Sequence, residues 1–401
     1  MKRKNQLAGI IAAALILTFS ACKKENNFTN PGTSTTASGD DMISERGQNP
    51  DEEILSASGE NERHSNNGFV YTESNDVAHN SILCYKQHAD GHLSYESTTM
   101  SGGAGNGAGL GSQGAVVLDE HHAWLYAVNA GDNSVSSFEV HSDGSLMLAH
   151  TTSSGGTTPV SVTTHHNLLY VVNAGSDNIK GLQIGAGGSL TDIAGSMQSL
   201  SITGAGAAQI SFSPNGYYLY VTEKATNMIT TFHVNGSGVA GAGASMASVG
   251  QTPFGFEFAR GFMVVSNAAG GAAGAGSATS YSGTNSGNLN DVNGAIANNQ
   301  AAPCWVAVTH HGRFAFTTNT ATDNISSYYV APSGGLYLIH SAIPSGDAPI
   351  DMVIAGNNYY AYTLCAADHT IREYNRTFLG GLNLNGSISN LPDHAAGLAA
   401  Y

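Results

Sequence analysis

The sequence predicts an all-β protein, a seven-bladed β-propeller that is closed by its C-terminal strand pairing into the first blade. Three observations support this prediction. Of 401 residues, 50 are Gly and only 11% are charged, while 41% are apolar, which is typical of many short strands joined by turns. One strand pattern recurs seven times along the chain, and a strand that the first copy lacks is found after the last copy.

The repeat is clearest in three segments that contain a Leu-Tyr pair and end on a polar residue: 125–129, 169–173 and 219–223. Six residues after each end comes an apolar residue, and three residues later another; the same spacing follows Asn319 and Cys365. Two further copies, which end at Glu73 and Asn267, carry an insertion in the first gap. The seven ends lie 44–56 residues apart, a length that suits a propeller blade of four short strands.

The two ends of the repeat region complement each other. Most copies are preceded by an apolar segment that opens with Pro, as at Pro159, Pro253, Pro303 and Pro349. Residues 60–67, at the same place before the first copy, are polar, whereas an additional segment of this kind occurs at 392–400. We expect this C-terminal segment to become the innermost strand of the first blade, which would close the ring and leave no open edge.

The N-terminus has the features of an export signal. Residues 2–4 are basic, residues 7–19 are uncharged and mostly apolar, and residues 19–22 read Phe-Ser-Ala-Cys. This ending resembles a bacterial lipobox, which implies cleavage before Cys22 and lipidation of that residue. Acyl chains on Cys22 would anchor the protein to a membrane.

Three regions follow from these patterns. Residues 1–21 are interpreted as a lipoprotein signal peptide, residues 22–67 as a flexible tether poor in apolar side chains, and residues 68–401 as the propeller. Lys23 and Lys24 stand where an Asp would imply retention in the inner membrane. We therefore expect a lipid-anchored protein of the bacterial cell envelope, in the outer membrane, facing either the periplasm or the exterior.

The Leu-Tyr-Val-Val-Asn segment at 169–173, with its following Asn-Ile, resembles the YVTN-type repeat and the lactonase family of seven-bladed propellers. The resemblance implies a lactone-hydrolysing enzyme with its site at one mouth of the central channel. Members of the family that act on sugar lactones commonly carry Arg and His at the start of inner strands, and here no Arg stands at those positions. Phosphorylated substrates favour clustered cations, so we expect an unphosphorylated lactone or cyclic ester as the substrate.

Polar residues at the predicted strand ends are the candidates for the site. In a propeller, loops after second strands and before first strands share one face. For catalysis, as the groups that activate water, we select Glu73, Glu223 and His394. For binding, including stabilisation of the carbonyl oxyanion, we select Gln113, Gln209, Lys224, Asp351 and Asp393. These polar groups would serve equally well to line a hydrated channel, and that alternative remains open.

Glycine-rich stretches at 101–114 and 268–277, together with 280–302, are expected to form long loops around the mouth of the channel. Neither glycine-rich stretch follows a strand and opens a helix, as a phosphate-binding loop does.

Other classes of site and partner are disfavoured. A formal charge of −15 repels nucleic acid. The paired histidines lie in turns on the opposite face and point apart, so we expect no metal site and no cofactor. These pairs are His121–His122, His165–His166 and His310–His311. The remaining partners are a small-molecule lactone or a glycan, with membrane contact through the lipid anchor only, and we expect a monomer.

A second function fits the same fold. The missing cations favour a non-catalytic propeller that presents its channel-mouth loops to a glycan or a protein, because propellers host many unrelated functions.

Overall fold

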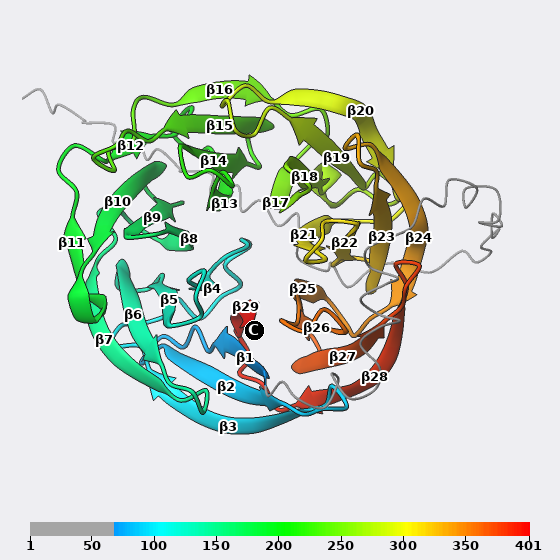
Figure 1. Cartoon of the computed structure of the whole chain (residues 1–401), viewed down its shortest axis with the longest axis horizontal. Helices are drawn as coiled ribbons and strands as arrows, with labels where there is room; N and C mark the ends of the chain where they lie inside the picture. The colour runs from blue at the N-terminus through cyan, green and yellow to red at the C-terminus, as the bar shows by residue number, and fades with distance from the viewer. Residues whose placement is uncertain (1–67) are drawn as a thin grey trace, which may run out of the picture.

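The computed structural model describes residues 68–401, and these residues form a ring of seven antiparallel β-sheets around a central axis (Figure 1). The predicted seven-bladed propeller is confirmed. The lipobox Cys22, the signal peptide and the tether lie outside the described residues.

Each blade is a sheet whose strands run in order from the axis to the rim. Blade 1 consists of β29 (Ala396–Ala400), β1 (Gly68–Glu73), β2 (Ser81–Gln87) and β3 (Leu93–Met100). Blade 2 consists of β4 (Val116–Leu118), β5 (Trp124–Asn129), β6 (Ser134–Val140) and β7 (Leu146–Ser153). Blade 3 consists of β8 (Pro159–His165), β9 (Leu168–Asn173), β10 (Asn178–Ile184) and β11 (Leu190–Asp192), with β12 (Gln198–Ser199) also paired to β10.

The second half of the ring repeats this arrangement. Blade 4 consists of β13 (Ala207–Phe212), β14 (Tyr218–Glu223), β15 (Met228–His233) and β16 (Ala244–Ala247). Blade 5 consists of β17 (Pro253–Ala259), β18 (Phe262–Asn267), β19 (Ser277–Ser282) and β20 (Asn290–Ala297). Blade 6 consists of β21 (Pro303–Val308), β22 (Phe314–Asn319), β23 (Asn324–Val330) and β24 (Leu336–Pro344). Blade 7 consists of β25 (Pro349–Ile354), β26 (Tyr360–Cys365), β27 (Thr370–Arg376) and β28 (Leu382–Ser389).

Two single-turn 3₁₀ helices, η2 (Ala186–Gly188) and η3 (Ala269–Gly271), interrupt the loops. The long loop expected at 280–302 is wrong in part, because residues 280–282 belong to β19 and residues 290–297 form β20. Alternation of apolar and polar residues is weak there, so the sequence pattern does not reveal an outer strand.

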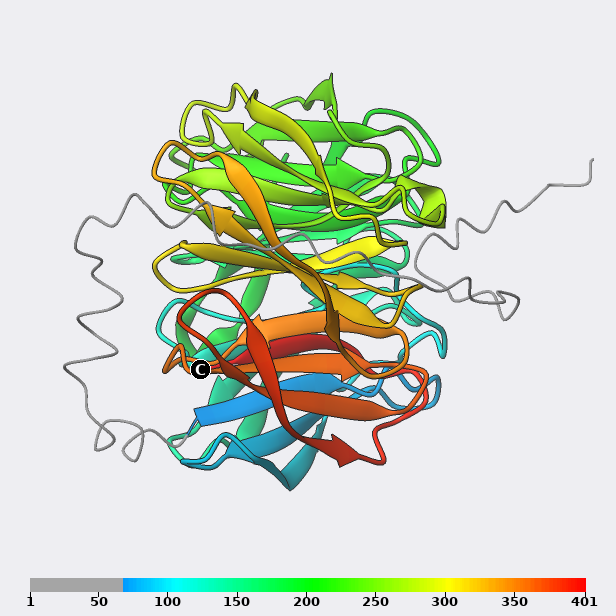
Figure 2. The same cartoon turned by 90° about the vertical axis from the view of Figure 1, so that its right-hand side faces the viewer.

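The predicted closure of the ring is confirmed. Strand β29 pairs with β1 through Val70–Ala400, Tyr71–Ala399 and Glu73–Ala396. In the view turned by 90°, the red C-terminal strand lies beside the blue first strand (Figure 2). Tyr401 continues this contact, since its backbone N–H donates to the carbonyl of Phe69 at 3.2 Å. The innermost strand of blade 1 is thus supplied from the other end of the repeat region.

The cores lie between neighbouring blades, where the second strands are buried on both faces. The Tyr of the repeat reaches from one blade into a turn of the next. Tyr71 Oη donates to Gly144 O at 2.9 Å, and Tyr220 Oη donates to Thr284 O at 2.7 Å. Tyr362 Oη donates to Gly91 O at 2.9 Å and so joins blade 7 to blade 1. A buried tyrosine needs such an acceptor, and for these three tyrosines the acceptor is a backbone carbonyl of the next blade.

A second polar contact crosses the junction of blades 7 and 1. His92 Nδ1 lies 2.7 Å from Glu373 Oε2, and the N–H of Leu93 donates to Glu373 Oε1 at 2.9 Å. Glu373 is buried and His92 is half exposed. The carboxylate of Glu373 raises the pKa of His92, because it favours the protonated imidazole.

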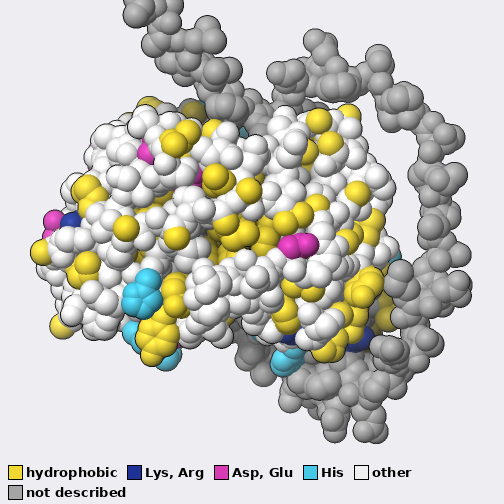
Figure 3. Space-filling view, turned by 90° about the horizontal axis from the view of Figure 1, so that it is seen from above, with side chains coloured by type: hydrophobic (Ala, Val, Ile, Leu, Met, Phe, Trp, Pro, Cys, Tyr) yellow, Lys and Arg dark blue, Asp and Glu magenta, His cyan; other side chains and the backbone are white. Residues whose placement is uncertain are grey.

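Charged side chains are few on the side of the molecule seen in Figure 3, in keeping with the composition. Within residues 68–401, no helix has the length and apolar character needed to cross a membrane.

Candidate functional site

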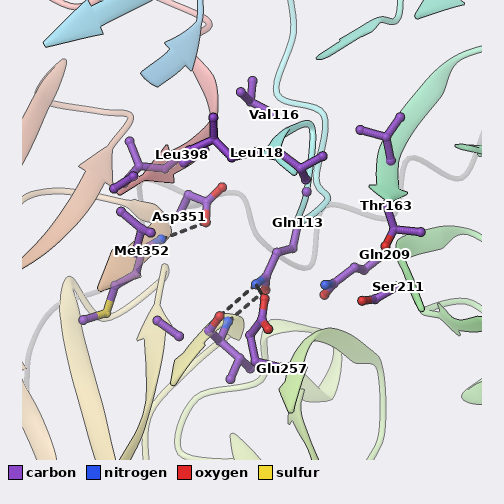
Figure 4. Close-up of a pocket in the computed structure, with 18 of the residues that line it drawn as sticks. Gln113, Val116, Leu118, Thr163, Gln209, Ser211, Glu257, Asp351, Met352 and Leu398 are labelled. Atoms are coloured by element: carbon purple, nitrogen blue, oxygen red, sulfur yellow. Dashed lines mark hydrogen bonds between the residues drawn. The ribbon is translucent and has the colours of Figure 1, made fainter. Parts of the chain in front are cut away.

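A cavity of about 370 Å³ lies on the axis of the ring, and all seven innermost strands contribute to its wall (Figure 4). The lining runs from the beginnings of these strands, at Gln113, Gln209 and Asp351, to the turn that follows β4, at Asp119 and His122. Its apolar part consists mainly of Val116, Leu118, Val308, Met352, Ile354 and Leu398. A cavity of this size with a few converging polar groups is the usual form of a small-molecule site.

One end of the channel is crossed by an arm, which we define as residues 101–115, the connection from blade 1 to blade 2. Gln113 Nε2 donates to Val306 O at 2.8 Å, and the N–H of Val306 donates to Gln113 Oε1 at 2.9 Å. Trp305 Nε1 donates to the carbonyl of Ser112 at 2.8 Å. These bonds tie the arm to the inner strand of blade 6, on the other side of the axis.

Gly255 makes room for the arm. A Cβ at this position would lie 2.1 Å from Gln113 Oε1 and 2.7 Å from the carbonyl oxygen of Cys304. No side chain fits into that space, so β17 needs a glycine where the arm passes. Phe254 and Trp305, whose ring centroids are 4.8 Å apart, are buried at the same end of the inner strands.

Two carboxyl groups face into the inner part of the cavity, Glu257 from β17 and Asp351 from β25. Burial raises the pKa of Glu257 to about 7, although Gln113 Nε2, which donates to Glu257 Oε1 at 3.3 Å, opposes this shift. Burial raises the pKa of Asp351 well above its ordinary value, and the negative charge of Glu257 adds to this effect. Asp351 is only 2% exposed, and its Oδ1 accepts the N–H of Met352 at 2.8 Å.

Gln209, on the inner strand β13 of blade 4, is a further polar side chain of the cavity. Its Oε1 accepts the N–H of Phe256 at 2.7 Å, and its Nε2 donates to the carbonyl of Phe256 at 3.0 Å. The second hydrogen on Nε2 has no acceptor among the described residues, and the side chain lines the cavity. Gln209 can therefore offer one N–H to a bound molecule.

Three of the sequence-selected residues, Gln113, Gln209 and Asp351, meet in this cavity. Lys224 lies outside it, against the arm. Its Nζ donates to the carbonyl of Gly111 and stands 4.9 Å above the ring of Phe254. Burial lowers the pKa of Lys224 to about 8.

Glu73 and Glu223, selected for catalysis, do not line the cavity. Both are fully buried at the ends of second strands. Glu223 accepts hydrogen bonds from Ser201, Thr226 and Thr230, so its carboxylate is surrounded by donors. Glu73 accepts one from Asn80 Nδ2 at 2.9 Å, and burial raises its pKa.

The corresponding residues of other blades explain why Glu73 and Glu223 are buried away from the cavity. In blades 2 and 6 the same position holds Asn129 and Asn319, whose side chains donate to nearby side-chain oxygens of the following strand. The strand-end position is thus a buried hydrogen-bonding position in several blades.

His394 and Asp393, also selected, lie in the segment that leads into β29 and are exposed. The side chain of Asp393 is 83% exposed, and its Oδ1 is 3.9 Å from His369 Nδ1. Neither residue lines the cavity.

Glu257 was not among the sequence-selected residues, yet the sequence carries a signal for it. Asp351 stands two positions after Pro349, and Glu257 stands four positions after Pro253. Because side chains alternate along a strand, positions two and four after the first residue point to the same face. The alternation of side chains along the inner strands therefore predicts that both carboxyl groups point toward the axis.

The paired histidines lie in or beside the turns that join first and second strands, as expected. The ring of His122 stacks on that of Tyr401, with centroids 5.1 Å apart, and burial lowers the pKa of His122. Within residues 68–401, no three His, Cys, Asp or Glu side chains are grouped so as to hold a metal ion.

Comparison with known proteins places this geometry in context. Residues 104–201 and 187–275 match a single family model, described as lactonase, 7-bladed beta-propeller. This match confirms the resemblance to the lactonase family. No curated protein matches the sequence.

Solved structures of the same architecture are numerous. A putative 6-phosphogluconolactonase from Bacteroides uniformis has 18% sequence identity and a TM-score of 0.66, over 82% of this chain and 98% of that one. A putative 6-phosphogluconolactonase from Bacteroides fragilis has 18% identity and a TM-score of 0.65, over 84% and 99% of the two chains. The periplasmic gluconolactonase of Pseudomonas aeruginosa has 16% identity and a TM-score of 0.66, over 82% and 98%. At such identities the likeness shows the fold alone.

Proposed function

We propose that this lactonase-like propeller hydrolyses an unphosphorylated lactone or cyclic ester, and that the reaction takes place in the axial cavity. The observation that supports this most is Glu257, a carboxyl with a pKa of about 7 that faces a cavity together with Asp351 and two side-chain amides. A base with a pKa near the working pH is well suited to activating water.

The chemistry follows from the protonation states. The ionised Glu257 takes a proton from water, and the resulting hydroxide adds to the lactone carbonyl carbon. The tetrahedral oxyanion accepts a hydrogen bond from the second N–H of Gln209. The ring C–O bond then breaks, the leaving oxygen takes the proton from Glu257, and a hydroxy acid is released.

The lining argues against a phosphorylated substrate. Among the described residues that line the cavity, none is Lys or Arg. Lys224, the cation next to the arm, donates to Gly111 O instead. A phosphate group in this cavity would have no cationic partner and would face two carboxyls, which is unfavourable.

The place of action is part of the proposal. The N-terminal pattern that ends at Cys22 supports export and lipid anchoring in the cell envelope, in the outer membrane. The partner would then be a small lactone outside the cytoplasm, handled by a monomer.

The experiment is a pH-stat assay of the purified protein with unphosphorylated sugar lactones and simple γ- and δ-lactones. We expect Glu257→Gln to reduce kcat at least about 100-fold, the range for loss of a general base. Glu96→Gln, which changes an exposed carboxyl on β3, is the matched control and should leave kcat unchanged. Turnover that survives Glu257→Gln but is lost in Glu223→Gln and His394→Gln would move the site to the residues selected from the sequence.

The non-catalytic alternative is tested alongside. If no lactone is hydrolysed and the protein binds an immobilised glycan, the hydrolase proposal fails and a binding propeller takes its place.

A further inference from the structure

We propose that the axial cavity selects a lactone carrying a permanent positive charge, such as a quaternary ammonium group, next to the reacting ring. This inference rests on the proposed function, since it names the substrate class of the same site. It follows from the charges, the partners and the shape of the cavity.

The ionisable groups that line the cavity are mostly acidic. They are Glu257 and Asp351 in the inner part, and Asp119 and His122 toward the turns. Burial lowers the pKa of His122, which disfavours the positively charged form of this imidazole. The cavity therefore contains carboxyl groups that no described cation of the lining balances.

Neither inner carboxyl has a cationic partner among the described residues. Glu257 accepts from the neutral amide of Gln113, and Asp351 accepts from a backbone N–H. A buried carboxylate without a countercharge is strongly unfavourable. A cation on the ligand would supply the missing charge to both groups at once, whereas a neutral ligand of the same shape would leave them uncompensated.

The remaining wall suits a bulky, weakly hydrated cation. Leu118, Met352 and Leu398 line the same cavity as the carboxyls (Figure 4). Ile354 adds to this apolar lining. A trimethylammonium group loses less hydration on burial than a compact ammonium and can contact methyl groups on all sides. A cavity with apolar walls and carboxyl groups matches a ligand that has an apolar surface and a positive charge.

The test compares two lactones of nearly equal shape, α-trimethylammonio-γ-butyrolactone and α-tert-butyl-γ-butyrolactone. Each kcat/KM is divided by the rate constant of hydroxide-catalysed hydrolysis of the same lactone, because the ammonium group activates the carbonyl. We expect the corrected value to be at least about tenfold higher for the cationic lactone, which corresponds to ~1.4 kcal/mol. Asp351→Asn should reduce this preference to within about threefold, and Glu96→Gln should retain it.

The outcomes separate the two proposals. Equal or faster corrected hydrolysis of the neutral lactone overturns the charge selection and leaves the hydrolase standing. If neither lactone is hydrolysed, the hydrolase fails, and binding of both lactones to the unaltered protein is measured by calorimetry. Tighter binding of the cationic lactone then supports the charge selection, and equal binding or no binding overturns it. This binding measurement uses the unaltered protein, so it does not depend on whether Asp351→Asn folds.

Discussion

Replacing Gln113 by Ala tests whether the arm at 101–115 is held across the channel by one side chain. The substitution removes both hydrogen bonds to Val306 and leaves the contact between Trp305 and Ser112 in place. The arm contains six glycines from Gly102 to Gly111 and has no strand of its own before β4. Its first half is also bonded to Asn75 and Asp76 of blade 1, so the bonds of Gln113 matter most for the residues next to it.

The magnitude follows from the bonds that are lost. Each hydrogen bond contributes about 0.5–1.5 kcal/mol net, so two of them predict a loss of about 1–3 kcal/mol in the free energy of unfolding. The N–H and carbonyl of Val306 then face the cavity, where water can replace Gln113. We therefore expect the lower half of that range, together with faster hydrogen exchange in the part of the arm next to Gln113.

Two measurements check this. Urea unfolding gives the change in free energy, and hydrogen exchange read by mass spectrometry gives the protection of residues 101–115. Gln209→Ala is the matched control, because Gln209 makes the same pair of bonds to Phe256 but belongs to a strand inside blade 4. It should cost a similar free energy without any change in exchange of the arm.

Exchange in the arm that is equally slow in Gln113→Ala and in the unaltered protein would refute the reasoning. So would a variant in which Gln209→Ala loosened the arm to the same extent, since the effect would then not depend on the bonds that cross the axis.

Three further predictions follow. If Glu257 is the general base, kcat/KM should rise between pH 5 and pH 8 and level off above its pKa of about 7, because only the carboxylate takes up a proton; a pH–rate profile that is flat over this range contradicts the assignment. Since the folded-state pKa of His92 is raised above its unfolded value, its bond to Glu373 stabilises the protein fully below about pH 6.5 and less as the pH rises through the folded-state pKa. His92→Gln should therefore lower the free energy of unfolding more at pH 5.5 than at pH 9, and an equal loss at both values would exclude the ion pair. Deleting residues 391–401 removes β29 with the buried Leu398 and exposes the edge of β1, which should cost on the order of 5 kcal/mol or more; an unchanged thermal melting curve would contradict this.

The sequence is sufficient to predict the ring because its signals are local and repeated. The Leu-Tyr pairs mark second strands, and their regular spacing gives the number of blades. The polar stretch at 60–67 and the apolar segment at 392–400 are far apart in the chain, but each is out of place in its own surroundings. Matching the two predicts the pairing of β29 with β1.

The site is harder to predict because it depends on contacts that leave no periodic signal. The bonds from Gln113 to Val306 join residues 193 positions apart, through a glycine-rich arm without alternation. Glu257 could be assigned to the axis by strand parity, whereas the raised pKa of its side chain depends on the burial that the ring provides. The strand-end glutamates illustrate the reverse case: Glu73 and Glu223 share a position with Asn129, and the repeat itself indicates a common structural environment.

The arm also gives the pore a direction. Because Gln113 and Trp305 form hydrogen bonds across one end, we expect molecules to reach Glu257 and Asp351 from the side of His122 and to leave by the same opening. A hydroxy acid still in the cavity would then exclude the next lactone, so product inhibition would be strictly competitive. Its carboxylate would meet the ionised Glu257, and this repulsion would speed its departure.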